Sequence, residues 1–119
     1  MTTRKGQARP DVDLEAMQAH AGEAARLLKA LANERRLQVL CLLAGGERSV
    51  GEINALLDLS QSALSQHLAV LREEGLVDTR REAQQVHYSL VPGPAAAVMA
   101  TLYGIYCGGG DAPRTGGKA

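Results

Sequence analysis

Two thiols are the most reactive side chains in this sequence. Cys41 lies in the apolar run VLCLL and Cys107 follows LYGIY, so the two are far apart along the chain. A deprotonated thiol is a nucleophile and a metal ligand. Free cysteine is also among the most buried residue types and often only fills space in a core. The sequence leaves both interpretations open, a reactive dithiol or inert packing, and only the fold can bring the two residues together.

Enzyme-like arrangements around these thiols are missing from the sequence. It contains no Cys-x-x-Cys motif, no convincing Cys/His/Asp set and no Gly-rich phosphate loop. The three histidines, His20, His67 and His87, fall on separate segments, whereas a zinc site needs about four nitrogen or sulfur ligands in one place. We therefore expect no enzyme activity, no cofactor and no metal centre. A small thiol peroxidase or sulfurtransferase is the enzyme alternative, which turnover of peroxide or thiosulfate would test.

A second distinctive stretch, SQSALSQHLAVLREEG, runs from Ser60 to Gly75. Its front is polar, and no acidic residue precedes Glu73. Hydroxyl and amide side chains both donate and accept hydrogen bonds, and glutamine can pair bidentately with adenine. The stretch is therefore either a surface that reads DNA bases or a solvated helix end. The candidate DNA-contacting residues are Ser60, Gln61, Ser62, Ser65, Gln66 and His67.

Apolar periodicity and capping residues predict the elements that position these groups. The expected helices cover residues 13–31, 34–44 behind the cap Asn33, 49–57 with the capping box Ser49–Glu52, and 60–75 with the cap Ser60. The alternating segment LVDTRREAQQVHYSL predicts a two-stranded hairpin with its tip near residues 82–84. A last helix is expected from Ala95 to about Cys107.

This order predicts a mainly α fold with a small β-hairpin, the winged helix-turn-helix (α-α-α-α-β-β-α). In a helix-turn-helix the second helix enters the major groove, and its N-terminal residues touch base edges. The stripe Leu64, Leu68 and Leu71 would anchor the opposite face to the body. Formal net charge is zero, so any DNA affinity must come from local charge. Candidate contacts to the sugar–phosphate backbone on the hairpin are Arg80, Arg81, Gln84, Gln85 and His87.

A chain of 119 residues fits one domain. We expect a DNA-binding and dimerisation domain over residues 12–108, a disordered arm over 1–11 and a flexible tail over 109–119. No apolar run approaches a membrane span and the N-terminus is no signal peptide, which predicts a cytoplasmic protein. The segment 95–106 is apolar all round, which favours a homodimer over packing within one subunit. Tyr103 and Tyr106 are expected at that interface rather than around a thiol.

From Leu31 to Leu90 the sequence resembles the winged helix-turn-helix of the ArsR/SmtB repressors, most specifically in LSQSALSQHLAVLREEGLV. The resemblance implies a homodimer, joined through its first and last helices, that binds an inverted repeat of double-stranded operator DNA and represses nearby genes. Two metal sites of that family are not matched. Residues 52–58 lack the family's Cys-x-Cys pair, and residues 94–107 contain no Asp, Glu or His.

The two cysteines, with SVGE, LSQ and the LYGIYC ending, resemble the persulfide-sensing (SqrR/BigR-like) branch. That resemblance implies that Cys41 and Cys107 sense reactive sulfur species by forming a di- or polysulfide bridge that releases the operator. A direct disulfide needs Cα atoms within about 7 Å, whereas a chain of sulfurs spans farther. We hypothesise that this separates persulfides from peroxide. The alternatives are a general oxidant-responsive repressor, a thiol-binding metal or metalloid-responsive repressor, and a protein-binding module without DNA affinity.

Overall fold

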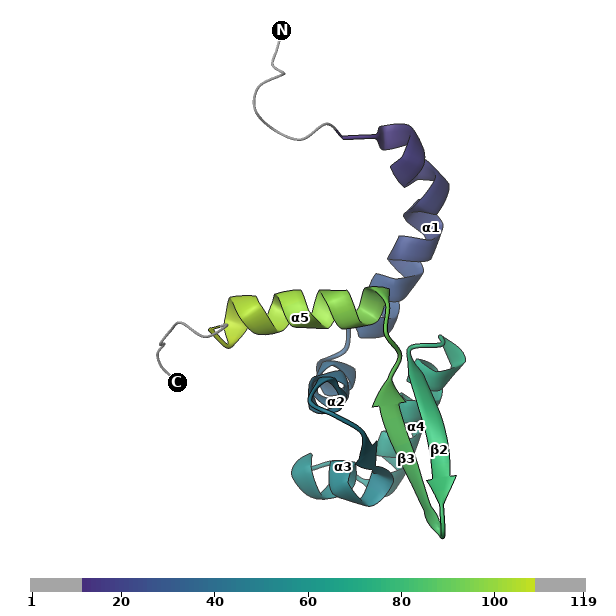
Figure 1. Ribbon diagram of the computed structural model, residues 1–119, viewed down its shortest axis with the longest axis vertical. Helices are drawn as coiled ribbons and strands as arrows, with labels where there is room; N and C mark the ends of the chain where they lie inside the picture. Colours follow the sequence, from purple (N-terminus) through teal and green to yellow (C-terminus); the bar gives the residue numbers. More distant parts are fainter. Residues whose placement is uncertain (1–11, 109–119) are drawn as a thin grey trace, which may run out of the picture.

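The computed structural model describes residues 12–108, and the expected arm over 1–11 and tail over 109–119 lie outside these residues (Figure 1). Residues 12–108 form five helices and three strands. In order they are α1 (Leu14–Leu31), α2 (Glu34–Ala44), β1 (Arg48–Ser49), α3 (Val50–Leu56), α4 (Gln61–Glu73), β2 (Val77–Glu82), β3 (Gln85–Leu90) and α5 (Pro94–Tyr106). The predicted winged helix-turn-helix is confirmed, with every expected helix and the hairpin in place.

Each of the three helices around the turn begins at a polar cap read correctly from the sequence. Asn33 accepts hydrogen bonds from the backbone N–H groups of Arg35 and Arg36 at the start of α2. At α3, the Ser49 hydroxyl accepts from the Glu52 N–H at 3.1 Å, and the Glu52 carboxylate accepts from the Ser49 N–H at 2.8 Å. This reciprocal pair fixes where the short helix α3 starts, and therefore how it approaches α4.

The sheet contains one strand that the sequence did not predict. β1 has only two residues and pairs antiparallel with β3, which gives a three-stranded sheet in the order β1-β3-β2. Two residues are too few to show an alternating pattern, so this strand depends on its partner. The hairpin turn lies at Ala83 and Gln84, as expected, and Ala83 adopts a left-handed conformation with φ of 57°.

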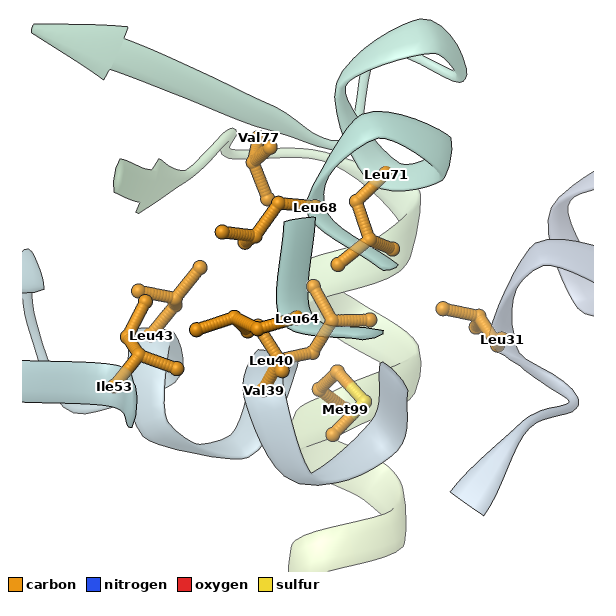
Figure 2. Packing of buried hydrophobic residues seen from close by; sticks show 10 residues of the cluster. All are labelled: Leu31, Val39, Leu40, Leu43, Ile53, Leu64, Leu68, Leu71, Val77 and Met99. Atoms are coloured by element: carbon orange, nitrogen blue, oxygen red, sulfur yellow. The ribbon is translucent and has the colours of Figure 1, made fainter. Parts of the chain in front are cut away.

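The core is aliphatic and lies where α2, α3 and α4 meet the sheet and the start of α5 (Figure 2). Leu64, Leu68 and Leu71 are at most 2% exposed, which confirms the predicted stripe on α4. They pack with Leu40 of α2 and Ile53 of α3, both fully buried. Burying a leucine contributes about 1.5–3 kcal/mol, so this stripe holds α4 to the body with its polar face outward.

The first and last helices extend from this body. α5 contacts α2 and then runs past it, and α1 rises away from the other elements (Figure 1). Ala95 and Met99 of α5 are buried, whereas its C-terminal half is exposed. Within residues 12–108, no helix has both the length and the apolar character needed to cross a membrane.

Replacing Ser49 with Ala should destabilise the fold by about 1 kcal/mol, because the cap is lost at a position that is only 6% exposed. Thermal unfolding at fixed protein concentration should show a fall in Tm of roughly 4–8 °C. The control Ser49→Gly should cost only a few tenths of a kcal/mol. If the Ser49→Ala variant had the same Tm as the unchanged protein, the capping box would not stabilise α3.

Candidate nucleic-acid interface and thiol sites

The polar face of α4 is free to meet another molecule. Gln61, Ser62, Ser65 and Gln66 are exposed, and no side chain within residues 12–108 hydrogen-bonds to theirs. The first turn of α4 carries no acidic residue. Ser60 differs, because its hydroxyl accepts from the Ala63 N–H at 3.1 Å and so caps the helix. The helix N-terminus, with its positive dipole end, therefore presents hydrogen-bonding groups of both kinds.

His67 is less exposed than the four residues of this face. It is half-buried, and burial is the main cause of its lowered pKa. The positive charges of Arg36 and Arg35, at the start of α2, lower the pKa of His67 further. The side chain is therefore neutral near pH 7, and its burial makes it the least accessible of the candidates on α4.

The strand register separates the two arginines of the hairpin onto opposite faces of the sheet. Successive side chains of a strand alternate between faces. Val77, which is buried in the core, shares its face with Thr79 and Arg81, whose cross-strand partners are Tyr88 and Val86. Arg81 therefore lies on the side of the hairpin that packs against α4, and it is exposed.

Arg80 lies on the other face and is held by carboxylates. Its guanidinium donates to both oxygens of Glu47, at 3.0 and 2.7 Å, and to Glu82 at 3.1 Å. Hydrogen bonding to Arg80 holds the pKa of Glu47 below its usual range. His87 is half-buried on the same face, with its Nε2 3.8 Å from Glu82. Among the predicted DNA contacts on the hairpin, Arg80 is thus held by carboxylates. The other exposed candidates have no side-chain hydrogen bond within the described residues; they are Arg81, Gln84 and Gln85.

One further basic residue was missed from the sequence. Arg72 is exposed on α4 and lines a groove together with Ser65, Ala69 and Tyr88, between the helix and the sheet. It lies on the same helix face as Ser65, seven positions later. Helical periodicity from Ser65 could have found it, but the sequence reasoning stopped at the polar front of the helix.

Both thiols are free and exposed. Cys41 lies on α2 between the buried residue Leu40 and the half-buried Leu42, and its side chain turns outward. Cys107 is the residue at which α5 ends. The interpretation of Cys41 as an inert core residue is therefore wrong, because the core excludes it. The helices that carry the two cysteines pack together, and the buried residues of α5, Ala95 and Met99, lie in the half of the helix away from Cys107.

Large apolar side chains remain uncovered on α1 and α5. On α5 they are Tyr103, Ile105 and Tyr106, which are 55–80% exposed, and on α1 they are Leu14, Met17 and Leu28, which are 55–62% exposed. Patches of this kind mark interaction surfaces. Within the part of the chain that the structure describes, no group of three or more His, Cys, Asp or Glu side chains is placed to hold a metal ion.

Comparison with known families agrees with this architecture. Residues 33–79 match the family model described as bacterial regulatory protein, arsR family. The chain is 53% identical over 96 residues to the transcriptional activator HlyU of Vibrio cholerae, covering 81% of this chain and 89% of that protein.

Two solved structures show the same fold. The transcriptional repressor BigR of Xylella fastidiosa superposes with a TM-score of 0.76 at 44% identity, covering 81% of this chain and 98% of the other. A homodimeric winged helix-turn-helix DNA-binding domain from Mycobacterium bovis superposes with a TM-score of 0.66 at 37% identity, covering 80% of this chain and 86% of that one.

Proposed function

Because the chain belongs to the ArsR family of bacterial regulatory proteins, in its BigR-like branch, we propose that it is a homodimeric repressor whose two thiols sense reactive sulfur species. The family membership makes it a transcriptional regulator. The observation that carries the finer proposal is the placement of its only two cysteines. Both are exposed, and they lie on α2 and at the end of α5, two helices that contact each other.

DNA binding is assigned to the exposed face of α4 and to the α4 side of the hairpin. Gln61, Ser62, Ser65 and Gln66 would meet base edges in the major groove. In this arrangement α4 lies in the major groove and the hairpin lies over the neighbouring minor groove. The DNA backbone that separates the two grooves then runs between α4 and the hairpin. Arg72 and Arg81 are exposed on that side and would contact its phosphates.

Replacing Arg81 with Gln should flatten the salt dependence of DNA binding. Each lost phosphate contact reduces the slope of log affinity against log salt by about 0.9, so a symmetric dimer should lose about 2. The measurement is the affinity for an operator duplex across a salt series. The matched control is the double variant Glu47→Gln/Arg80→Gln, which removes a hairpin arginine and keeps the local charge. Its slope should stay unchanged, and equal losses in both variants would refute the assignment of Arg81.

Dimerisation is assigned to the uncovered apolar side chains of α1 and α5. Two subunits related by a two-fold axis present two copies of α4, which suits an inverted repeat. The homodimeric relative from Mycobacterium bovis supports this assignment. The two half-sites must then be read at a spacing of about one DNA turn, roughly 34 Å.

The sensing reaction is a two-electron oxidation of the dithiol, with an organic persulfide as the oxidant. The thiolate of one cysteine attacks the sulfane sulfur of R–S–SH, which forms Cys–S–SH and releases R–SH. The thiolate of the second cysteine then attacks the inner sulfur and expels HS⁻, leaving a disulfide. If both cysteines carry an extra sulfur, the same attack expels HS⁻ and leaves a trisulfide. The bridge would hold α5 against α2 and so change how the two copies of α4 are spaced.

The test is intact-protein and peptide mass spectrometry after separate treatment with an organic persulfide and with peroxide, each paired with a DNA-binding assay. A bridge between Cys41 and Cys107 formed by persulfide, together with weaker DNA binding, supports the proposal. An equal response to peroxide through a plain disulfide would make the protein a general oxidant sensor. No response to either reagent would overturn thiol-based redox sensing, and arsenite would then be tested as a dithiol ligand.

A further inference from the structure

The attachment of α1 to the body is confined to one end. Only Ala30 and Leu31, in its last turn, are buried, and the helix is exposed over most of its length towards Leu14. At 1.5 Å per residue its 18 residues extend about 27 Å. α1 is therefore a lever with its pivot at Leu31, and a small change of angle at the pivot becomes a large displacement at Leu14.

One bidentate ion pair connects this lever to the end of α4. Arg26 donates from Nε to Glu74 Oε1 at 2.7 Å and from Nη2 to Glu74 Oε2 at 3.3 Å. Glu74 is the C-terminal cap of α4, where its backbone N–H donates to the carbonyl of Val70 at 3.0 Å. The side chain of Glu74 is 23% exposed and that of Arg26 is 71% exposed, so the pair is shielded from water mainly on its carboxylate side. Two parallel N–H···O bonds fix direction as well as distance.

Open grooves lie on both sides of this ion pair. A groove of about 590 Å³ is lined by His20, Leu27, Glu74 and Pro94 among others, and a groove of about 610 Å³ by Ala25, Lys29, Arg36 and Val70 among others. Both grooves are also lined by Arg26. Leu27, one turn before Leu31, is half-buried against the core. Towards Leu14 from there, close apolar packing does not set the angle of α1 to α4, and the Arg26–Glu74 pair spans the space between the two helices.

We propose that Arg26 and Glu74 are positioning residues that fix the angle between α1 and α4, and thereby the half-site spacing that the dimer accepts. The inference rests on the proposed function, in which α1 forms part of the dimer interface. Arg26 lies about 7.5 Å from the pivot and Leu14 about 25 Å from it, by helix rise. A shift of 1 Å at the ion pair therefore moves the far end of α1 by about 3 Å, which is close to the rise of one base pair.

The experiment exchanges the charges in the full-length protein. The variants are Arg26→Glu, Glu74→Arg and the double variant that carries both changes. Lys29→Glu is the control, since it makes the same charge change on α1 in the groove beside the ion pair. The DNA probes are built from the half-site that the unchanged protein selects from a random pool. They are one isolated half-site and a series of inverted repeats whose spacers differ by single base pairs.

The expected result is a loss of spacing preference without loss of half-site binding. Each single variant should reduce the preference for the best spacer over its neighbours by about fivefold, a size that one such pair in each of two subunits can supply. The double variant should regain the preference and Lys29→Glu should keep it. If the replaced residue had only a structural role, the variant would lose affinity for the half-site and for the repeat together.

Three results would overturn the inference. In the first, the single variants keep the original spacer preference. In the second, the double variant fails to restore it. In the third, the single variants lose affinity for the isolated half-site. A different result would contradict the proposed function itself. In that case the unchanged protein binds the inverted repeat no more tightly than it binds one isolated half-site. That outcome is read from the unchanged protein alone, so the two failures are distinguishable.

Discussion

Replacing Ile105 with Asp should convert the protein into a monomer and reduce its affinity for an inverted repeat by at least about 100-fold. Ile105 is 64% exposed at the end of α5, where we propose that a second subunit covers it. An aspartate there would have to lose its hydration in an apolar interface. A dimer binds its second half-site at a high effective concentration, and a monomer loses that advantage, which is worth 10²–10⁴ in affinity.

Sedimentation analysis and a titration of repeat and half-site duplexes would measure both effects. The control for oligomeric state is Leu56→Asp, because Leu56 is similarly exposed at 56% but lies on α3, away from α1 and α5. It should remain dimeric. A dimeric Ile105→Asp variant would show that the exposed end of α5 is not the interface.

Replacing either cysteine with serine should leave the protein bound to DNA in the presence of an organic persulfide. The unchanged protein should lose about 10- to 100-fold in DNA affinity on treatment, the usual range of allosteric coupling. Since the bridge needs both sulfurs, Cys41→Ser and Cys107→Ser should each abolish this response. Both side chains are exposed, so serine should leave the affinity of the untreated protein unchanged.

Mass spectrometry of the single variants would check the order of the reaction. Each variant should gain sulfur at its remaining cysteine without forming a bridge within the subunit. If Cys107→Ser still released DNA on treatment, modification of Cys41 alone would be sufficient and the bridging mechanism would be wrong. If either untreated variant bound DNA poorly, that cysteine would have a structural role despite its exposure.

Local sequence signals were sufficient to predict the helices and the hairpin that position the exposed face of α4. Ser60 caps α4 and the spacing of Leu64, Leu68 and Leu71 assigns its buried side, because these signals act within one or two helical turns. The caps Asn33 and Ser49 were read in the same way. The alternation of the hairpin also depends on neighbouring residues, so it was visible in the sequence.

The contacts that the sequence did not reveal join distant residues. Arg80 was predicted to contact DNA, yet it pairs with Glu47, and Arg26 pairs with Glu74. A chain with 13 acidic and 13 basic residues offers too many opposite-charge combinations for any pair to be chosen without the fold. The two-residue strand β1 was missed for a related reason, since its hydrogen bonds go to β3, far along the chain.

The three-stranded sheet leaves β2 at its edge, with backbone groups free to accept a strand from another molecule. The outer half of β2 reads Arg80-Arg81-Glu82 and is exposed. A second copy of this strand laid alongside would bring its charged side chains next to those of β2, and charges on an edge strand oppose such pairing. The edge is therefore protected against strand-to-strand aggregation, so regulators crowded at high local concentration on one DNA molecule should stay soluble and separate.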